Sequence, residues 1–361
     1  MKIPRVYSLG LTDVNKFLVY NLAKYPEQPK IPDIVLLLKS DEQLSRFVSN
    51  DSKVSVTDYT NLRASTKFTQ LMAAYQPPRF ANGDHAPIEN LTISSSSFQL
   101  KTELKKFQKS INQNSNILLL NPSMSATQTI NQLYGNSPKK PNIYQCLSTH
   151  SLWGAGEFGV NNIGRGNLTI TKVPKNSNAP ISEQNNLIDM KNEPPFIQLL
   201  SKLREVDPVF VSYFNFQLLQ MESLVIKACI EPLTDVFDCY NGDLLKMDKI
   251  SEISGDLIDE SCQILKIAHP ELVDSPLGSI ALNSERLLDV VFNNLNLNKE
   301  GGREIAKLQK RSKKQEIFET NGYLSSLAKK HKIKAPLNTT YSDILRAKYS
   351  LANNRGLNGR L

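Results

Sequence analysis

The opening of the chain constrains the fold most, because two short apolar segments flank a helix that can cross between them. Ile3–Leu9 and Ile34–Leu38 read as buried strands, and Val14–Lys24 reads as the helix that joins them. A proline-marked loop separates this helix from the second strand. Such a βαβ unit places its two strands in one parallel sheet, so the chain is predicted to open with an α/β domain.

Later segments continue the alternation of strands and helices, and the last part of the chain is predicted to contain only helices. A chain of 361 residues with 40% hydrophobic content can bury two cores, so two domains are expected. We predict a mostly parallel, Rossmann-like sheet domain over residues 1–173, an exposed linker over 174–195 and an all-helical domain over 196–361. The supporting strands are Ile88–Ile93, Asn116–Leu120, Ile143–Leu147 and Leu168–Val173, and the helices are Leu100–Ile111, Ile197–Arg204, Phe216–Glu231, Ile253–Ala268, Glu285–Leu295, Arg303–Lys314 and Ile317–Lys330.

The formal charge of +8 is concentrated near the C-terminus. Residues 299–361 hold 15 Lys and Arg against 5 Asp and Glu, a local charge of +10 that leaves −2 for the first 298 residues. On a helix, the first group of these cations forms one stripe, and a second group surrounds His331. The candidate contacts for RNA or ribosomal phosphates are Arg303, Lys307, Lys310, Arg311 and Lys314, then Lys329, Lys330, Lys332 and Lys334.

These cations have alternative explanations. A charge run is often an ordinary solvated helix face, and anionic lipid headgroups attract the same side chains as RNA. Stacking platforms for single-stranded RNA need exposed Phe or Tyr alternating along strands, and no such segment is visible in the sequence. Charge therefore predicts affinity for an anionic partner without identifying the partner.

Cysteine spacing and apolar run length exclude several classes of protein. The four cysteines form no CxxC pair and have no histidines at metal-ligand spacing, so neither a zinc site nor a disulfide framework is expected. The longest apolar run, Ile34–Leu38, is too short to cross a bilayer, so membrane association is expected to be peripheral. The first strand leaves no room for a cleaved amphipathic presequence, which favours the cytosol or import by an uncleaved or internal signal.

The loop after the first strand lacks the dinucleotide fingerprint. That fingerprint, G-x-G-x-x-G, keeps side chains away from the pyrophosphate and from the helix N-terminus. The corresponding run begins at Gly10, but Thr12 and Asn15 stand at the second and third glycine positions. Asp13 adds a negative charge where phosphates would lie, and Lys16 is close enough in sequence to cancel part of it. No cofactor site is therefore predicted.

The segment Gln217–Leu245 resembles the ketopantoate reductase family, whose motif reads K-L-x-x-N-x-x-I-N-P-L-T and then N-G-x-L. The family's general-acid lysine falls on Ser223, its helix asparagine on Lys227 and the asparagine before the proline on Glu231. An aliphatic hydroxyl gives a ketone little general-acid help, because its pKa lies far from neutral. The frame itself matches at Leu224, Ile230, Pro232, Leu233, Thr234, Asn241, Gly242 and Leu244.

At other positions too, residues of the family's active site are replaced, whereas residues of the family's fold match. Pro122 stands where the family has a site asparagine, and Ser94–Ser97 contains no lysine where the family has one before the nicotinamide region. His150 lies in a turn that the family shares, where a structural hydrogen bond is expected rather than catalysis. The resemblance implies a ketopantoate reductase-like fold, an α/β domain followed by an all-α domain, with no catalytic residue. Its C-terminal matches are Glu316, Asn321, Gly322, Tyr323, Pro336 and Asn338.

A narrower resemblance rests on Ile3–Gly10, Pro29–Leu38, Arg46–Phe47, Asn50–Lys53 and Ala86–Leu91, together with Glu231–Leu233 and Asp238–Cys239. These segments resemble yeast mitochondrial translational activators of cytochrome b mRNA, reductase-like proteins without the reductase site. The resemblance implies action on the 5′ leader of that message, with the mitochondrial ribosome and other translational activators, on the matrix side of the inner membrane.

Two alternatives stay open. One is an active NADPH-dependent 2-dehydropantoate 2-reductase with a divergent site, in which Lys227 supplies the acid one helical turn from Ser223 and phosphates tolerate Asp13. The other is a protein-only adaptor on the inner membrane, whose cations meet lipid headgroups and no RNA.

Overall fold

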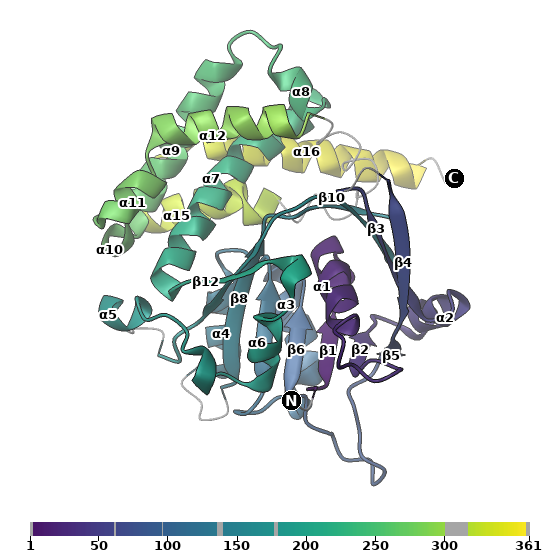
Figure 1. The fold of residues 1–361 in the computed structure, drawn as a ribbon. Coiled ribbons are helices and arrows are strands. Elements are labelled where there is room, and N and C mark those ends of the chain that lie inside the picture. The colour runs from purple at the N-terminus through teal and green to yellow at the C-terminus, as the bar shows by residue number, and fades with distance from the viewer. Residues whose placement is uncertain are drawn as a thin grey trace. The chain divides into compact units, whose positions relative to one another are not determined.

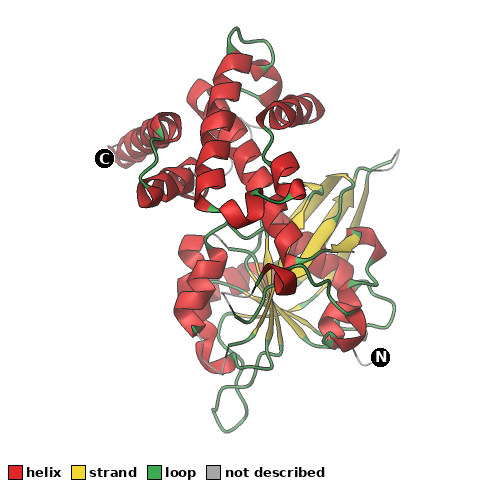
Figure 2. Ribbon diagram, turned by 90° about the vertical axis from the view of Figure 1, so that its left-hand side faces the viewer, coloured by secondary structure: helices red, strands yellow, loops and turns green. Residues whose placement is uncertain are grey.

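The computed structural model describes residues 3–60, 63–95, 97–135, 140–176, 180–299 and 317–358. The chain folds into two compact units, Met1–Phe216 and Gln217–Leu361. The described strands all lie in the first unit, and the described part of the second unit is helical (Figure 2). The predicted succession of an α/β domain and an all-α domain is therefore confirmed.

The main sheet of the first unit has eight strands in the order β12-β11-β8-β7-β6-β1-β2-β5. All neighbouring strands are parallel except β8 and β11, which pair antiparallel. The mostly parallel sheet is thus present, and the expected strands are all found in it. Its strands are β1 (Val6–Leu9), β2 (Ile34–Leu37), β5 (Met72–Ala74), β6 (Asn90–Ile93), β7 (Asn116–Leu120), β8 (Asn142–Ser148), β11 (Leu168–Lys172) and β12 (Pro208–Phe210).

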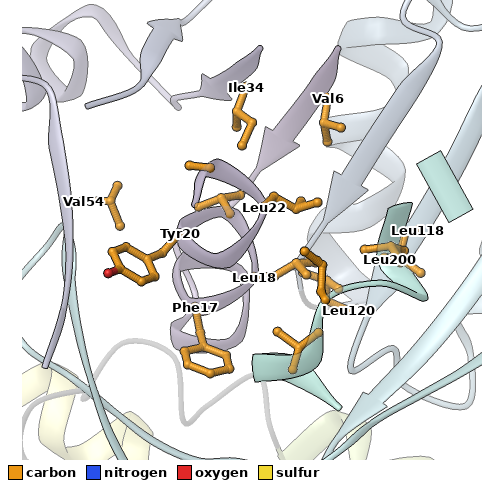
Figure 3. Close-up of a cluster of buried hydrophobic side chains, with 14 of the residues drawn as sticks. Val6, Phe17, Leu18, Tyr20, Leu22, Ile34, Val54, Leu118, Leu120 and Leu200 are labelled. Carbon is orange, nitrogen blue, oxygen red and sulfur yellow. The ribbon is translucent and has the colours of Figure 1, made fainter. Parts of the chain in front are cut away.

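Helices cover both faces of this sheet because successive strand residues point to opposite sides. In β7, Leu118 and Leu120 pack in one core with Leu22 of α1, whereas Leu119 packs in the other core with Leu104 of α3. Figure 3 shows the first of these cores around α1. The helices concerned are α1 (Asp13–Ala23) and α6 (Pro195–Leu200) on one side, and α3 (Ser97–Phe107) and α4 (Ala126–Tyr134) on the other.

A second, four-stranded sheet was not expected from the sequence. It comprises β3 (Lys53–Asp58), β4 (Ser65–Gln70), β9 (Ser151–Gly154) and β10 (Gly159–Gly164) in the order β4-β3-β10-β9. Its inner face packs on α1 through Val54, Val56 and Val160, so α1 lies between the two sheets (Figure 1). Only one face of these strands is buried in the core, which explains why the sequence does not show them as continuous apolar runs. A further helix, α2 (Asp41–Ser49), precedes β3.

The boundary between the units lies later than predicted. The sequence places residues 196–216 in the helical domain, but β12 pairs with β11 and Phe196 is fully buried in the core around α1. Strand pairing over this sequence distance leaves no local signal, so the predicted boundary falls too early. The segment 174–195 is not wholly irregular either, since it contains α5 (Ile181–Gln184) and the 3-10 turn Met190–Asn192.

The second unit is a helical assembly in which α9 packs against α12, α15 and α16. The helix α7 runs to Phe237 with Pro232 inside it, beyond the expected end at Glu231. The predicted helix over Arg303–Lys314 lies outside the described residues. The described helices are α7 (Tyr213–Phe237), α8 (Asn241–Leu244), α9 (Ile250–Ala268), α10 (Pro270–Val273), α11 (Pro276–Ala281), α12 (Ser284–Leu297), α15 (Asn321–His331) and α16 (Pro336–Asn358). Of these, α8, α10, α11 and α16 were not predicted.

Candidate functional site

The loop between β1 and α1 keeps its first glycine for a steric reason. Gly10 has a φ of +92°, and a Cβ at this position would overlap the backbone carbonyl of Ser94 at the end of β6. The turn that would begin a dinucleotide site is therefore present, and only glycine fits it.

The second glycine position carries a side chain that closes the loop. Thr12 is the N-cap of α1, and its hydroxyl lies 3.4 Å from the backbone nitrogen of Asn15, from which it accepts. The same hydroxyl hydrogen-bonds the Ser94 hydroxyl. The first turn of α1 is thus capped by the protein itself, at the point where a dinucleotide-binding helix presents free N–H groups to a pyrophosphate.

The third glycine position is filled by a buried amide. Asn15 accepts hydrogen bonds from the hydroxyls of Ser8, at 2.9 Å, and Thr92, at 3.1 Å. Its Nδ2 donates to the carbonyl oxygens of Leu9 and Gly10. Asn15 is only 1% exposed, so it joins β1, β6 and the start of α1 in the space that a glycine would leave open. Its role is structural.

Asp13 and Lys16 form an ion pair in the same turn. The Asp13 carboxylate lies 2.9 Å from the Lys16 ammonium, which also donates to the carbonyl oxygen of Gly159 at 2.7 Å. The Lys16 side chain is 4% exposed and that of Asp13 is 26% exposed. A carboxylate at a helix N-terminus takes the favourable place of an anion, and here its counter-cation is already committed. These residues do not fit a pyrophosphate.

The face of α7 that resembles the catalytic helix carries no general acid of the family type. Ser223, Lys227 and Glu231 follow each other at four-residue spacing, so they share one face of α7. Ser223 and Glu231 are partly buried, and Lys227 is exposed. The chemistry available on this face is that of a hydroxyl, a solvated ammonium and a partly buried carboxylate, without the family's lysine at the first of the three positions.

His150 is held in a structural role, as predicted. Its Nδ1 accepts from the backbone nitrogen of Gly166 at 3.1 Å, and its Nε2 lies 3.0 Å from the carbonyl oxygen of Val206. The ring packs on Phe17 with a centroid separation of 4.9 Å. With Nδ1 accepting, Nε2 carries the proton and donates to Val206, so both ring nitrogens are used.

The C-terminal positions of the family pattern hold the second unit together. Pro232 has no N–H, which deprives the Ala228 carbonyl of its normal partner four residues later in α7. Asn321, fully buried, donates to that carbonyl at 2.8 Å and to Asn338 Oδ1 at 3.0 Å. The helix break within α7 is therefore repaired by a side chain from α15. Glu316, another position of this pattern, lies outside the described residues.

Glu260 completes this network from α9. Its carboxylate accepts from the backbone nitrogens of Leu337, at 2.9 Å, and Asn338, at 2.8 Å, in the first turn of α16. It also accepts from Asn338 Nδ2, which contacts Ser261 Oγ at 3.2 Å as well. A carboxylate at this helix N-terminus is stabilised by the free N–H groups and the helix dipole.

The structure describes only one of the two predicted basic groups. Lys329, Lys330, Lys332 and Lys334 are exposed around the C-terminal end of α15, where cations complement the helix dipole. Burial lowers the pKa of the nearby His269; Glu271 raises it, and the His331 and Lys330 charges lower it again. Arg303, Lys307, Lys310, Arg311 and Lys314 lie outside the described residues.

The four cysteines of the chain are free and buried, and burial raises the pKa of Cys229 and of Cys262 to about 11. Such thiols are largely protonated at neutral pH and are therefore poor nucleophiles and poor metal ligands. Within the described ranges, no cluster of His, Cys, Asp and Glu could hold a metal ion. No helix in this part of the chain is both long and apolar enough to cross a membrane.

Comparison with known proteins finds relatives of the second unit and of the whole chain. Residues 215–349 match the family "Ketopantoate reductase PanE/ApbA C terminal". The chain is 31% identical to the cytochrome b translational activator CBS2 of Saccharomyces cerevisiae over 98% of both chains, and 26% identical to a probable 2-dehydropantoate 2-reductase of Schizosaccharomyces pombe over 96% of this chain and 97% of that one. Its fold is similar to a PanE/ApbA family ketopantoate reductase from Ralstonia eutropha, with a TM-score of 0.70 at 13% identity, covering 96% of this chain and 98% of the other.

Proposed function

The chain belongs to the family of the yeast cytochrome b translational activator, built on the ketopantoate reductase fold, and from this premise we propose that it activates translation of cytochrome b mRNA in mitochondria. It acts on the 5′ leader of that message with the mitochondrial ribosome and other translational activators. It does so at the matrix side of the inner membrane, with peripheral attachment, and without reductase activity.

The observation that carries this proposal is the loop Gly10–Lys16. Thr12 and Asn15 occupy glycine positions of the dinucleotide fingerprint, Asp13 adds a negative charge between them, and each has a partner within the protein. The side chains bond Ser94, Lys16 and Ser8, so they stabilise the fold and leave no room for a pyrophosphate. With this loop, the protein keeps the reductase-like fold without a cofactor, and the fold can serve to bind another partner.

An active reductase is the second candidate, favoured by the similarity to the probable reductase of Schizosaccharomyces pombe. It needs Lys227 as the proton donor and a pyrophosphate that displaces the Asp13 carboxylate from Lys16. Isothermal titration calorimetry of the full chain with NADPH separates the two candidates. Saturable binding supports the reductase, and absence of heat at millimolar cofactor supports the proposed function.

The decisive experiment is pulse-labelling of mitochondrial translation products in a strain that lacks the gene, grown with and without pantothenate. The proposal expects loss of cytochrome b alone, whatever the supplement. Normal labelling of all products together with a growth requirement for pantothenate would establish the reductase instead. Selective loss of cytochrome b, combined with a purified protein that floats with anionic liposomes but retains no RNA, would favour the protein-only membrane adaptor.

A further inference from the structure

The outer face of the second sheet combines aromatic rings with polar side chains. Val54, labelled in Figure 3, and Val56 of β3 are buried against α1. Ser55 and Thr57, which alternate with them, therefore point to the opposite side. The Thr57 hydroxyl lies 2.9 Å from the Thr66 hydroxyl of β4, which places both on this outer face. One row of paired residues then crosses all four strands: Trp153, Asn161, Thr57 and Thr66.

Three aromatic residues share this face although they are far apart in the sequence. Phe68 lies two residues after Thr66 in β4 and is 55% exposed. Tyr59, 50% exposed, continues the ladder of β3, because its backbone nitrogen donates to the Asn162 carbonyl at 2.8 Å as that of Ser55 donates to Phe158. Trp153 is partly exposed, whereas its neighbour Leu152 packs toward the core.

Polar residues separate the three rings, so the rings do not form one apolar patch. Same-face residues on a strand are roughly 7 Å apart and neighbouring strands roughly 5 Å apart, so Phe68, Tyr59 and Trp153 lie at separate points around Thr57 and Asn161. Separate rings suit separate bases, and hydroxyl and amide groups between them suit a sugar-phosphate backbone. A protein-binding patch more often concentrates its apolar side chains at the centre.

Charge around this face favours a polyanion. Arg63 before β4 and Arg165 after β10 are exposed and make no ion pair with another described residue, whereas Lys67 pairs with Val56 and therefore belongs to the other side of the edge strand β4. Of the nearby carboxylates, Glu157 is held by Arg46 at 2.8 Å, and Asp58 alternates with Thr57 in β3, so it belongs to the other side of the sheet. Cations therefore border the aromatic rings, while these carboxylates are paired or point away from this face.

We propose that the outer face of the β4-β3-β10-β9 sheet binds single-stranded RNA, with Phe68, Tyr59 and Trp153 as stacking residues and Arg63 and Arg165 as phosphate contacts. The inference rests on the proposed function for its biological meaning, and on the geometry of this sheet for its chemistry. Duplex RNA is excluded as the ligand because its bases are stacked on each other and present no free faces to the rings.

The chain offers a direct reporter, because Trp153 is its single tryptophan. Titration of the full-length protein with a mixed-sequence, single-stranded RNA of about 20 nucleotides, which exceeds the site of one such surface, is expected to quench Trp153 fluorescence. The same RNA annealed to its complement is expected to leave the fluorescence unchanged. Binding of the single strand without any change in Trp153 fluorescence would overturn the proposal.

Substitutions on this face test whether its aromatic rings contribute to the RNA-binding free energy. Phe68→Ala and Tyr59→Ala are each expected to raise the Kd for single-stranded RNA about 5- to 150-fold by fluorescence anisotropy of labelled RNA, the range for loss of one stacked base. Phe68→Tyr keeps a ring and is expected to retain the original Kd. Phe80→Ala is the matched control, since Phe80 is 54% exposed in the same unit but outside the sheet. Equal Kd values for Phe68→Ala and Phe80→Ala would refute the assignment.

The failure of this inference is distinguishable from the failure of the proposed function. If RNA affinity depends on Lys329, Lys330, Lys332 and Lys334 but not on Phe68, the sheet is not the RNA surface, and cytochrome b labelling still tests the function separately. If Phe68→Ala abolishes cytochrome b labelling without weakening RNA binding, the face docks a protein and the RNA assignment is wrong. If Phe68→Ala weakens both, the assignment stands.

Discussion

The loop Gly10–Lys16 and the network around Asn321 both correspond to motifs of the reductase family. The family's residues are replaced in the loop and kept in the network. In the loop, the residues that would contact a cofactor are replaced by side chains bonded to the protein itself, such as Asn15 to Ser8. Around Asn321, the pattern residues are present and hold α7, α9, α15 and α16 together. Replacing a group that contacts only a ligand leaves no buried polar atom unpaired, whereas replacing a group that satisfies buried backbone does.

Asn321→Ala should produce the largest effect. It removes the buried partner of the Ala228 carbonyl and of Asn338, and the free energy of unfolding is expected to fall by about 4 kcal/mol. Urea unfolding followed by far-UV circular dichroism, which reports mainly the helices, measures it. Ser326→Ala on the exposed side of α15 is the control and should change stability by less than about 0.5 kcal/mol.

A double-mutant cycle sharpens this result. Pro232→Ala supplies an N–H that Ala228 can accept within α7, so the loss caused by Asn321→Ala should shrink by about 1–2 kcal/mol in that background. Strict additivity of the two substitutions would contradict the explanation that Asn321 compensates for the proline.

Asn15→Gly tests the opposite region. It restores a fingerprint glycine, but it removes hydrogen bonds to Ser8 and Thr92 and a filled position in the core. Unfolding of the first unit, followed by Trp153 fluorescence in urea, is expected to lose about 3 kcal/mol. The exposed turn substitution Asn114→Gly serves as the control, with an expected change under about 0.5 kcal/mol. An Asn15→Gly protein as stable as the parent would show that the loop is not structural.

Asp13→Ala should have a smaller effect on the same unit. It leaves the Lys16 ammonium, which is 4% exposed, with carbonyl partners only, at an expected loss of about 2 kcal/mol. Asp41→Ala is matched, since Asp41 also lies in the first turn of a helix but is exposed, and should lose about 0.5 kcal/mol through the helix dipole alone. Equal losses in the two variants would reduce the role of Asp13 to a dipole effect.

Ser223→Lys should change least. It restores the family's general acid on α7, yet NADPH oxidation with 2-dehydropantoate is expected to stay at background because the Thr12, Asp13 and Asn15 side chains remain in the cofactor loop. Measurable turnover by this single variant, monitored by NADPH absorbance, would show that the loop accepts a cofactor after all. Folding of the variant is checked by its circular dichroism spectrum.

Much of the fold could be predicted from local patterns, and the exceptions have physical causes. The buried parallel strands, such as Ile34–Leu37 and Asn116–Leu120, are continuous apolar runs and were predicted close to their observed limits. The second sheet was missed because β4 has only Thr69 buried and is exposed elsewhere, a pattern without an apolar signal. The domain boundary was displaced because β12 belongs to the main sheet only through its pairing with β11.

For the candidate sites too, the sequence shows what depends on single residues and not what depends on contacts between distant strands. Loss of the glycines at Thr12 and Asn15 and of the lysine at Ser223 was visible in the sequence, since each depends on the identity of one residue. The exposed aromatic face was not visible, because Tyr59, Phe68 and Trp153 come from strands separated by many residues. The signal that could have found it is the alternation of Ser55, Thr57 and Tyr59 with Val54 and Val56.

The sequence by itself determined which residues of the reductase pattern this chain lacks and that an α/β region precedes a helical region, because these follow from residue identity and from periodicity within single elements. Only the tertiary structure decided which contacts the residues at these positions make. Asn15 reaches Thr92, Lys16 reaches Gly159, and Asn321 reaches Ala228 across distances in the chain that no local pattern encodes. Such contacts arise from sheet register and helix packing, which bring distant residues together only after the whole unit has folded.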